Sequence, residues 1–455
     1  MYAFCQGFLL NILRKKLENG SMKNALLRGT LLLTIAGLFS RILGFFYRIF
    51  LANTIGAEGM GIYQLIFPIY SICFSLCASG IETAISKLTA EKYALGKQNE
   101  ASQILKLGLF ITGSLSIGCS LILFCYADYI SIAFLKEERC AALLKLLALA
   151  IPFGTTHACA YGYYYGIHKA GIPSIAQLIE QFFRIGSVFL LYQIYKTNQI
   201  ALTPSIAVLG LILGEFFAFI FTVTCLTFQS TKKNTVSLAH KKTLFLEIMH
   251  LSAPLTISRI CINLLASLES TLIPHSLRSY GMTSESALSV YGILNGMAIP
   301  FILFPNTLTS SISLMLLPEV SKSQAAGQLT HLKNTIRKSF SFCILLGCCS
   351  LLFFLFFGKM IGTMFFSNKL AGTFITILAW ICPFLYLNTT LSSVLNGLGK
   401  TNVTFFNGIA GLFLRIGFIC FLVPRIGIHG YLYGLLASQL FTTLSGCFFL
   451  RSAFH

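Results

Sequence analysis

Charged residues are scarce in this chain of 455 residues: 10% are Asp, Glu, Lys or Arg, whereas 56% are hydrophobic. A soluble domain carries about 25% charged residues. The mean hydropathy of +0.79 points in the same direction. This composition excludes an ordinary soluble protein and predicts an all-α integral membrane protein.

Motifs for metal, cofactor or nucleotide chemistry are also lacking. The 15 cysteines form no Cys-x-x-Cys pair and no Cys/His cluster, and most lie scattered in apolar segments. Cysteine in such segments acts as a small hydrophobic residue, so we predict no metal and no cofactor. Residues 399–401 read Gly-Lys-Thr, but a phosphate-binding loop needs a glycine at position 394, which is Val394.

Apolar runs long enough to cross a bilayer occur twelve times. A span needs about 20 such residues, because the hydrocarbon core is about 30 Å thick. The predicted spans are residues 26–51, 60–86, 104–126, 140–166, 175–195, 204–228, 246–273, 287–317, 340–357, 372–395, 402–423 and 428–450.

The basic residues predict the topology. If the N-terminus is cytoplasmic, twenty of the 33 Lys and Arg residues lie in cytoplasmic segments, seven in outer loops and six in spans. This is the positive-inside pattern, so both termini are predicted to be cytoplasmic. Topology and anionic lipid headgroups therefore explain the net charge of +19, and we predict no nucleic-acid partner.

The second half of the chain repeats the first. Three matched segments are each 231 residues apart: Pro152-Phe153 with Pro383-Phe384, 166–169 with 397–400, and 182–186 with 413–417. Tyr63 and Glu91 match Tyr291 and Glu319 at a separation of 228, and Ser-Arg-Ile at 40–42 recurs at 258–260. Six spans per copy give both copies the same orientation, so the predicted fold is two parallel six-helix repeats. Transporters built in this way bind their substrate between the halves.

The repeat divides the chain into predicted domains. These are a cytoplasmic arm or misassigned start at 1–23, an N-lobe at 24–228, a cytoplasmic linker at 229–245 and a C-lobe at 246–455.

Arginines lie inside predicted spans, where a charge costs roughly 2.5–3.5 kcal/mol on insertion scales. Arg41 and Arg48 fall on one face of the first span, and Arg259 is the repeat partner of Arg41 in the seventh. We expect Arg41 and Arg259 to line a central cavity. Arg48 is closer to the outer surface, where it could line the cavity or snorkel, and Lys145 is expected to snorkel.

A polar stripe follows one face of the second span. Its members are Gln64, Pro68, Ser71, Ser75, Ser79, Glu82 and Ser86, spaced three or four residues apart. The eighth span offers Asn295, Asn306, Ser310 and Ser313. Lipid cannot satisfy such stripes, so they face protein or water. We expect a wet cavity along the second-span stripe, although serines alone also serve helix packing.

The remaining span charges form candidate ion pairs. Glu180 precedes Arg184 by four residues, which is the favourable helical spacing. Arg415 has no such partner and could meet Glu215 or Glu269 across helices. Five mid-span arginines exceed four span carboxylates, which include Glu82. Because arginine suits phosphate oxygens, we expect an anionic cargo, a phosphate or diphosphate.

Three segments carry a family resemblance: Arg41 to Gly44 with Arg48, Ile55 to Tyr63, and Ile85 to Glu91. Over about residues 24–106 the chain resembles the stage V sporulation protein B family. That family is a polysaccharide-biosynthesis branch of the multidrug/oligosaccharidyl-lipid/polysaccharide exporter superfamily. The resemblance implies a V-shaped, two-lobed transporter in the bacterial cytoplasmic membrane. It also implies a lipid-linked oligosaccharide as cargo, for the sporulation branch the peptidoglycan precursor lipid II.

Lipid II flippases of the related mouse-virulence-factor family carry a cavity arginine in a Ser-Arg-x-Leu-Gly motif. Ser40 to Gly44 match this motif, so the resemblance assigns that role to Arg41. The second arginine of that family follows one residue closer than Arg48 does here, and that family has two further helices.

The sequence therefore predicts a flippase with no enzymatic activity. Arg41, Arg259 and Arg48 would hold the diphosphate, while the stripe from Gln64 to Ser86 would hydrate the sugars. Glu82, Glu215 or Glu269 could carry a coupling proton. A multidrug extruder of the same fold is the alternative, but it would place carboxylates where the first span has arginines. A membrane-bound glycosyltransferase or polymerase would need catalytic carboxylates on outer loops, and these loops are short.

Overall fold

The computed structural model describes residues 22–228 and 238–452, which are almost entirely helical. Most of the predicted N-terminal arm at 1–23 and residues 229–237 of the predicted linker lie outside the described residues.

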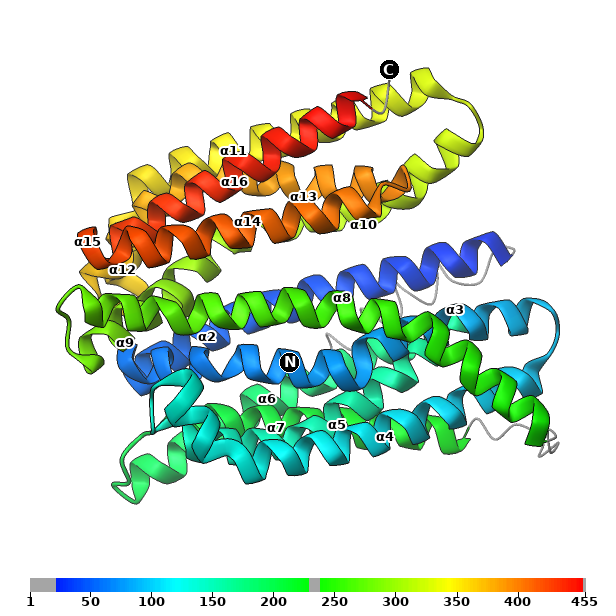
Figure 1. Cartoon of the computed structure of the whole chain (residues 1–455), viewed down its shortest axis with the longest axis horizontal. Coiled ribbons are helices and arrows are strands. Elements are labelled where there is room, and N and C mark those ends of the chain that lie inside the picture. The colour runs from blue at the N-terminus through cyan, green and yellow to red at the C-terminus, as the bar shows by residue number, and fades with distance from the viewer. Residues whose placement is uncertain (1–21, 229–237, 453–455) are drawn as a thin grey trace, which may run out of the picture.

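The helices of the first half run back and forth along the long axis of the molecule, between the left and right ends in Figure 1, and form one bundle. They are α2 (Met22–Phe74), η1 (Ser75–Ser79), α3 (Gly80–Ala94), α4 (Gln98–Tyr129), η2 (Ile130–Leu135), α5 (Cys140–Gly166), α6 (Gly171–Thr197) and α7 (Ser205–Phe228). η1 and η2 are π-helical segments within otherwise α-helical spans.

The second half forms the other bundle. It consists of α8 (Leu238–Ser279), α9 (Ser284–Gly292), η3 (Ile293–Ala298), α10 (Ile299–Ala325), α11 (Leu329–Phe366), α12 (Lys369–Leu378), η4 (Ala379–Ile381), α13 (Cys382–Gly397), α14 (Thr401–Phe421), α15 (Val423–Ile426) and α16 (Ile428–Ser452). In Figure 1 the helices from α10 to α16 lean away from the N-lobe toward the right-hand end, which gives the two-lobed V.

The described residues contain eleven continuous apolar helices long enough to cross a membrane. One of them, Ile35–Ala94, has 60 residues and would be about 90 Å long if straight. It consists of two helices that meet at Gly56, whose φ of 73° and ψ of 179° suit glycine. The chain reverses there, so the twelve predicted spans are present.

The turns between helices confirm the internal repeat. Three pairs of residues with positive φ are separated by 231 positions: Gly96 and Gly327, Lys136 and Ser367, His168 and Gly399. The hydrogen bonds match as well: the amide of Lys169 donates to Tyr164, and that of Lys400 donates to Leu395. The two halves thus share their backbone conformation at equivalent turns.

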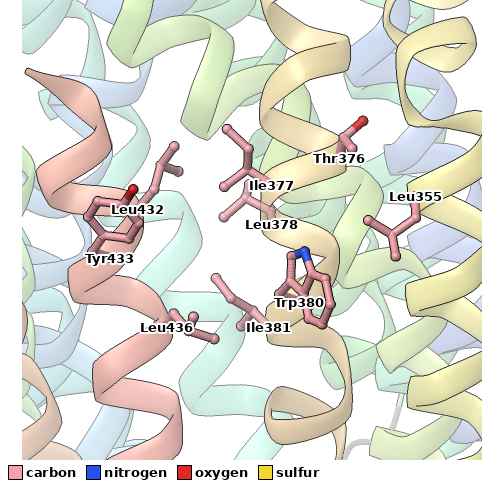
Figure 2. A pocket seen from close by; sticks show the side chains of 9 residues that line it. All are labelled: Leu355, Thr376, Ile377, Leu378, Trp380, Ile381, Leu432, Tyr433 and Leu436. Carbon is pink, nitrogen blue, oxygen red and sulfur yellow. The ribbon is translucent and has the colours of Figure 1, made fainter.

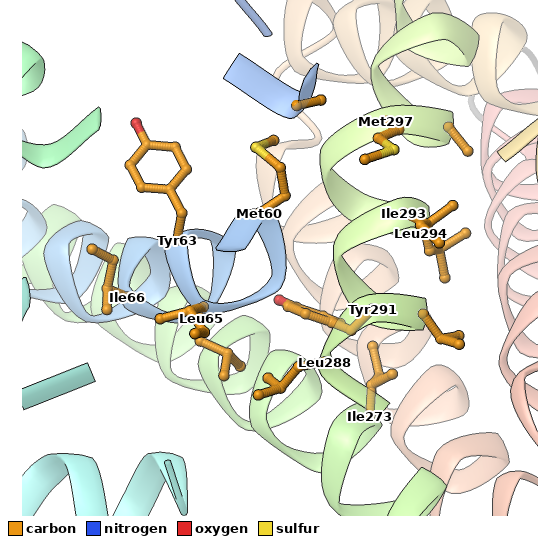
Figure 3. Close-up of a cluster of buried hydrophobic side chains, with 14 of the residues drawn as sticks. Met60, Tyr63, Leu65, Ile66, Ile273, Leu288, Tyr291, Ile293, Leu294 and Met297 are labelled. Carbon is orange, nitrogen blue, oxygen red and sulfur yellow. The ribbon is translucent and has the colours of Figure 1, made fainter. Parts of the chain in front are cut away.

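A large apolar cluster joins the two lobes at the end predicted to face outward. Met60 and Leu65 of α2 pack there with Leu288, Tyr291 and other residues of α9 and η3 (Figure 3). Helices α2 and α9 cross closely here because Gly61 lies against the carbonyl oxygen of Leu288, where a Cβ would collide.

Helix α8 bridges the two lobes. Leu244 and Ile248 near its start are buried in the same cluster as Ile81 and Ile85 of α3. Its later part packs along α14 in the C-lobe. Pro254 lies inside α8, which bends along its length in Figure 1, as predicted from the proline.

Polar groups form an interlobe contact at the predicted outer end, which we call the outer clasp. Arg139 lies 2.6 Å from both Glu58 and Glu137. From the C-lobe, Ser284 donates to Glu137 at 3.3 Å, and Arg278 donates to the carbonyl of Lys136 at 3.1 Å. The clasp therefore joins loop 136–139 of the N-lobe to residues 278–284 of the C-lobe.

Candidate functional site: an arginine cavity between the lobes

Arg41 and Arg48 line a single cavity, which we call the arginine cavity. The first half of α2 supplies both arginines, and α10 supplies the facing wall with Asn306 and Ser310. The cavity has a volume of about 350 Å³. The seven-residue spacing on one helix face thus brings both guanidinium groups to one site, and Arg48 points into the cavity with Arg41.

Neither arginine is neutralised by the protein. Among the described residues, no hydrogen bond or ion pair involves Arg41 or Arg48, and both side chains are exposed. One wall is aromatic, since Phe45 and Phe304 both line the cavity and their ring centroids are 4.6 Å apart. An unpaired charge within a membrane span is costly, so these groups need water or an anionic ligand.

Arg259 lies elsewhere in this conformation. From α8 it donates to the carbonyl oxygen of Ser79 at 2.7 Å and to the hydroxyl of Ser79, with Thr83 at 3.4 Å. It is therefore a link between α8 and the second span. In this conformation Arg259 is not among the residues that line the arginine cavity, because α8 packs against α3 here. These hydrogen-bond partners are neutral, and the described residues form no ion pair with Arg259.

The middle of the polar stripe is likewise occupied by α8. The amide of Asn263 donates to the hydroxyl of Ser75 at 2.6 Å and to the carbonyl of Ser71 at 3.3 Å. Ser75 and Ser79 are buried. The wet cavity expected along the stripe is therefore a helix contact at these positions, because Asn263 and Arg259 take up their hydrogen bonds.

The two ends of the stripe differ from its middle. Gln64 and Glu82 are half-buried. Within the described parts of the chain, neither side chain has a hydrogen bond or ion pair. Glu82 is thus the unpaired member of the four span carboxylates considered above.

A buried ion-pair network lies in the N-lobe. Arg184 lies 2.5 Å from Glu180, which confirms the predicted helical pair, and 3.5 Å from Glu215 of α7. Glu215 also contacts His157 at 2.6 Å and accepts a hydrogen bond from Tyr70 at 3.2 Å. His157 was not among the site residues predicted from the sequence, because its only signal was a histidine within an apolar span.

Three groups of this network have the spacing of metal ligands. The ligand atoms of His157, Glu180 and Glu215 lie within 4.8 Å of one another. However, one guanidinium nitrogen of Arg184 already contacts both carboxylates. Arg184 therefore supplies the cation that a metal would supply, and we interpret the network as an ion-pair cluster.

The repeat partner of Arg184 is paired in a different way. Arg415 of α14 lies 3.1 Å from Glu269 of α8, one of the two cross-helix partners considered above. Tyr431 of α16 donates to the same carboxylate at 2.8 Å. Asn295 lines a cavity beside this pair rather than the arginine cavity.

A separate pocket on the surface of the C-lobe is apolar. Its volume is about 300 Å³, and its lining includes Leu355, Trp380 and Tyr433 (Figure 2). Trp380 and Tyr433 are each 55% exposed, so this face contacts lipid in a membrane. It holds no charged side chain and does not resemble a site for an anion.

Comparison with known proteins agrees with this architecture. The family described as "Polysaccharide biosynthesis protein" matches residues 26–324, and the family described as "MatE" matches residues 276–421. Stage V sporulation protein B of Bacillus subtilis is 27% identical over 93% of this chain and 83% of its own length.

Two solved structures show the same fold. The lipid II flippase MurJ in an inward closed conformation has a TM-score of 0.73 at 16% identity, over 92% of this chain and 87% of its own. An inward-facing multidrug resistance MATE family transporter of the MOP superfamily has a TM-score of 0.69 at 13% identity, over 91% and 95%.

Proposed function

Because the chain belongs to the polysaccharide biosynthesis protein family, we propose that it is a flippase for a polyprenyl-diphosphate-linked saccharide. The favoured cargo is lipid II or a related polysaccharide intermediate, moved outward across the bacterial cytoplasmic membrane. Both termini would be cytoplasmic, as the distribution of Lys and Arg predicts.

The observation that carries this proposal is the pair of unpaired arginines in the arginine cavity. Arg41 and Arg48 project from one helix face into a space between the two lobes. A diphosphate offers several charged oxygens, and guanidinium groups bind such oxygens through two parallel hydrogen bonds. The cavity therefore suits the diphosphate of a lipid-linked saccharide.

The lobe arrangement supports alternating access. In this conformation the apolar cluster and the outer clasp join the lobes at the predicted outer end. The lobes lean apart toward the other end (Figure 1), where the cargo would enter from the cytoplasmic leaflet. The polyprenyl tail would remain in lipid, while the lobes rock about the bound head group.

The driving force is proposed to be the membrane potential, a proton or both. An inside-negative potential favours export of an anion by about 2.3 kcal/mol per charge per 100 mV. Glu215 and Glu269 are held in ion pairs. Of our three candidate proton carriers, Glu82 is the one without such a partner in the described residues. Transport at a rate independent of pH would argue against a proton.

A multidrug extruder of cations is the alternative, and the MatE family match over residues 276–421 favours it. A site for organic cations needs carboxylates and aromatic rings. The arginine cavity has aromatic rings but two arginines and no carboxylate among its lining residues. Its charge therefore favours the anionic cargo.

The test is a rescue experiment in cells whose own lipid II flippase can be switched off. The wild-type chain, Arg41→Ala and Arg425→Ala would be expressed at equal levels. Arg425 is an exposed arginine outside the cavity and serves as the matched control. Growth and outward exposure of lipid II would be measured together.

The proposal predicts rescue by wild type and Arg425→Ala and loss of rescue by Arg41→Ala. Rescue by all three would retain lipid II as cargo but remove the role of Arg41. Failure of a well-expressed wild type would exclude lipid II and direct the search to other lipid-linked saccharides.

A further inference from the structure

The C-lobe contains a second polar cavity system beside the arginine cavity. Two cavities of about 310 and 330 Å³ share Ala266, Arg415 and Gln439 in their linings. They therefore adjoin each other at the Arg415 side chain, and helices α8, α13, α14 and α16 contribute to both linings. We call the two cavities together the C-lobe crevice.

The C-lobe crevice adjoins the arginine cavity. Leu303 of α10 lines both the arginine cavity and the part of the crevice that holds Asn295. A ligand anchored at Arg41 and Arg48 can therefore extend past Leu303 into the C-lobe.

The two spaces differ in charge. Arg41 and Arg48 have no partner among the described residues, so the arginine cavity is cationic. In the C-lobe crevice, Arg415 lies 3.1 Å from Glu269, and Tyr431 donates to the same carboxylate. That pair is charge-balanced, so the crevice is polar but carries no net charge. A diphosphate is attracted to the first space and a neutral polar group fits the second.

The crevice also holds amide groups with unused hydrogen-bonding capacity. The Asn388 amide donates to Gln439 at 3.4 Å and to Thr442 at 3.1 Å. This leaves the Asn388 carbonyl and the Gln439 NH₂ without a protein partner in the described residues, and Asn295 likewise. Polar atoms left unpaired inside a membrane protein are costly, so water or a ligand must satisfy them.

We propose that the C-lobe crevice binds the uncharged saccharide head group of the same lipid whose diphosphate lies at Arg41 and Arg48. Sugar hydroxyls and N-acetyl groups both donate and accept hydrogen bonds, which matches the free carbonyl of Asn388 and the free NH₂ of Gln439. Tyr431 and Phe405 provide apolar surface within the linings. This inference rests on the proposed flippase function and adds the part of the site that distinguishes a saccharide-bearing lipid from a bare one.

The test compares two lipids on the purified full chain in lipid nanodiscs. One is undecaprenyl diphosphate, and the other is the same lipid carrying a di-N-acetylated disaccharide. Affinity would be measured for wild type, Asn388→Ala, Gln439→Leu, Arg41→Ala and Asn402→Ala. Asn402 is an exposed amide of α14 outside the crevice and is the matched control.

We expect wild type to bind the saccharide-bearing lipid more tightly than the bare lipid. Asn388→Ala and Gln439→Leu should each weaken binding of the saccharide-bearing lipid roughly tenfold, since one or two hydrogen bonds are lost, and leave the bare lipid unchanged. Arg41→Ala should weaken both lipids, and Asn402→Ala neither.

Equal affinity of wild type for the two lipids would overturn the saccharide site while retaining the diphosphate site. Equal weakening of both lipids by the amide variants would also overturn it, because a folding defect or a general role would then explain the loss. Absence of binding of either lipid to wild type would instead contradict the proposed flippase function itself.

Discussion

Arg184 and Arg415 occupy equivalent positions in the two repeats, and a glutamate pairs with each inside its lobe. Arg41 and Arg48, in contrast, have no protein partner in the described chain. Charged groups within membrane spans pair with one another or with backbone carbonyls, or they mark the path of a substrate. This difference separates the arginines that stabilise the interior of each lobe from those that we assign to the cargo.

Removing Glu215 should destabilise the N-lobe. Glu215 accepts from Tyr70, contacts His157 at 2.6 Å and lies 3.5 Å from Arg184. Glu215→Ala leaves buried polar and charged groups without their partner, which costs roughly 3–5 kcal/mol. We expect a clear fall in the thermal unfolding midpoint of the detergent-purified protein.

Glu319→Ala is the control for this measurement. Its partner His331 lies 3.3 Å away and the side chains of His331 and Glu319 are 57% and 43% exposed, so the loss should be within about 0.5 kcal/mol. Equal midpoints for Glu215→Ala and wild type would contradict a structural role for the network.

Residue spacing predicted some of these pairs and not others. The four-residue step from Glu180 to Arg184 places both on one helix face, so the sequence alone was enough. The contacts of Glu215 with His157 and of Arg415 with Glu269 join different helices. Such contacts depend on how helices pack, which one sequence does not state.

At the scale of secondary-structure elements, a change of pH can test whether the outer clasp holds the two lobes together. Burial opposes ionisation of Glu137, but the hydrogen bond and charge of Arg139, the Ser284 hydroxyl and the charge of Arg278 outweigh it. The pKa of Glu137 is therefore lowered. A group with a lowered pKa stabilises the closed state above its ordinary pKa, and this contribution is lost as the pH falls.

We expect the clasp to weaken as the pH falls below the ordinary glutamate pKa of about 4.3. Glu137→Gln should weaken it at neutral pH. Hydrogen–deuterium exchange of residues 278–284, corrected for the intrinsic rate, would measure both effects. Glu138→Gln changes the exposed neighbouring carboxylate and should have no effect. Unchanged exchange in Glu137→Gln would show that the clasp does not hold this end closed.

The spacing of polar residues along the second span did not predict which group covers them. The stripe on the second span has the spacing of a polar helix face, and the structure confirms that face. What covers it could not be read from the period: Asn263 and Arg259 of α8 occupy its middle. The spacing of the polar residues is the same whether the face meets water or another helix, so the sequence alone does not identify the partner.

At the scale of the whole molecule, Gly61 of α2 is predicted to allow α9 to pack closely and the two lobes to close at the outer end. A Cβ at this position would run into the backbone of Leu288 in the other lobe. Gly61→Leu should therefore push the lobes apart, at a cost of roughly 1–3 kcal/mol. Exchange of the α9 amides should become faster by about tenfold or more.

Gly113→Leu provides the matched glycine control, since a Cβ there meets nothing within 4 Å. Exchange in α9 should match wild type in this variant. Equal protection in Gly61→Leu and Gly113→Leu would mean that the lobes do not close by this crossing.

The twelve spans and the twofold repeat were predictable because hydropathy and residue spacing are local properties of the chain. The lean of the lobes, the bridging position of α8 and the place of Arg259 were not. They belong to one conformation of a molecule that is proposed to have at least two. The sequence repeat predicts the two six-helix halves and their symmetry. The contacts between the lobes determine which conformation the molecule adopts.

The most direct test of the account is transport of a fluorescent lipid II by the purified chain in vesicles. Wild type and Arg425→Ala should move the lipid across the bilayer, whereas Arg41→Ala and Arg48→Ala should each slow it roughly 10- to 100-fold. That range corresponds to one lost hydrogen bond to a charged group, about 1.5–3 kcal/mol. Equal transport by the folded arginine variants and wild type would contradict the claim that the arginine cavity holds the diphosphate.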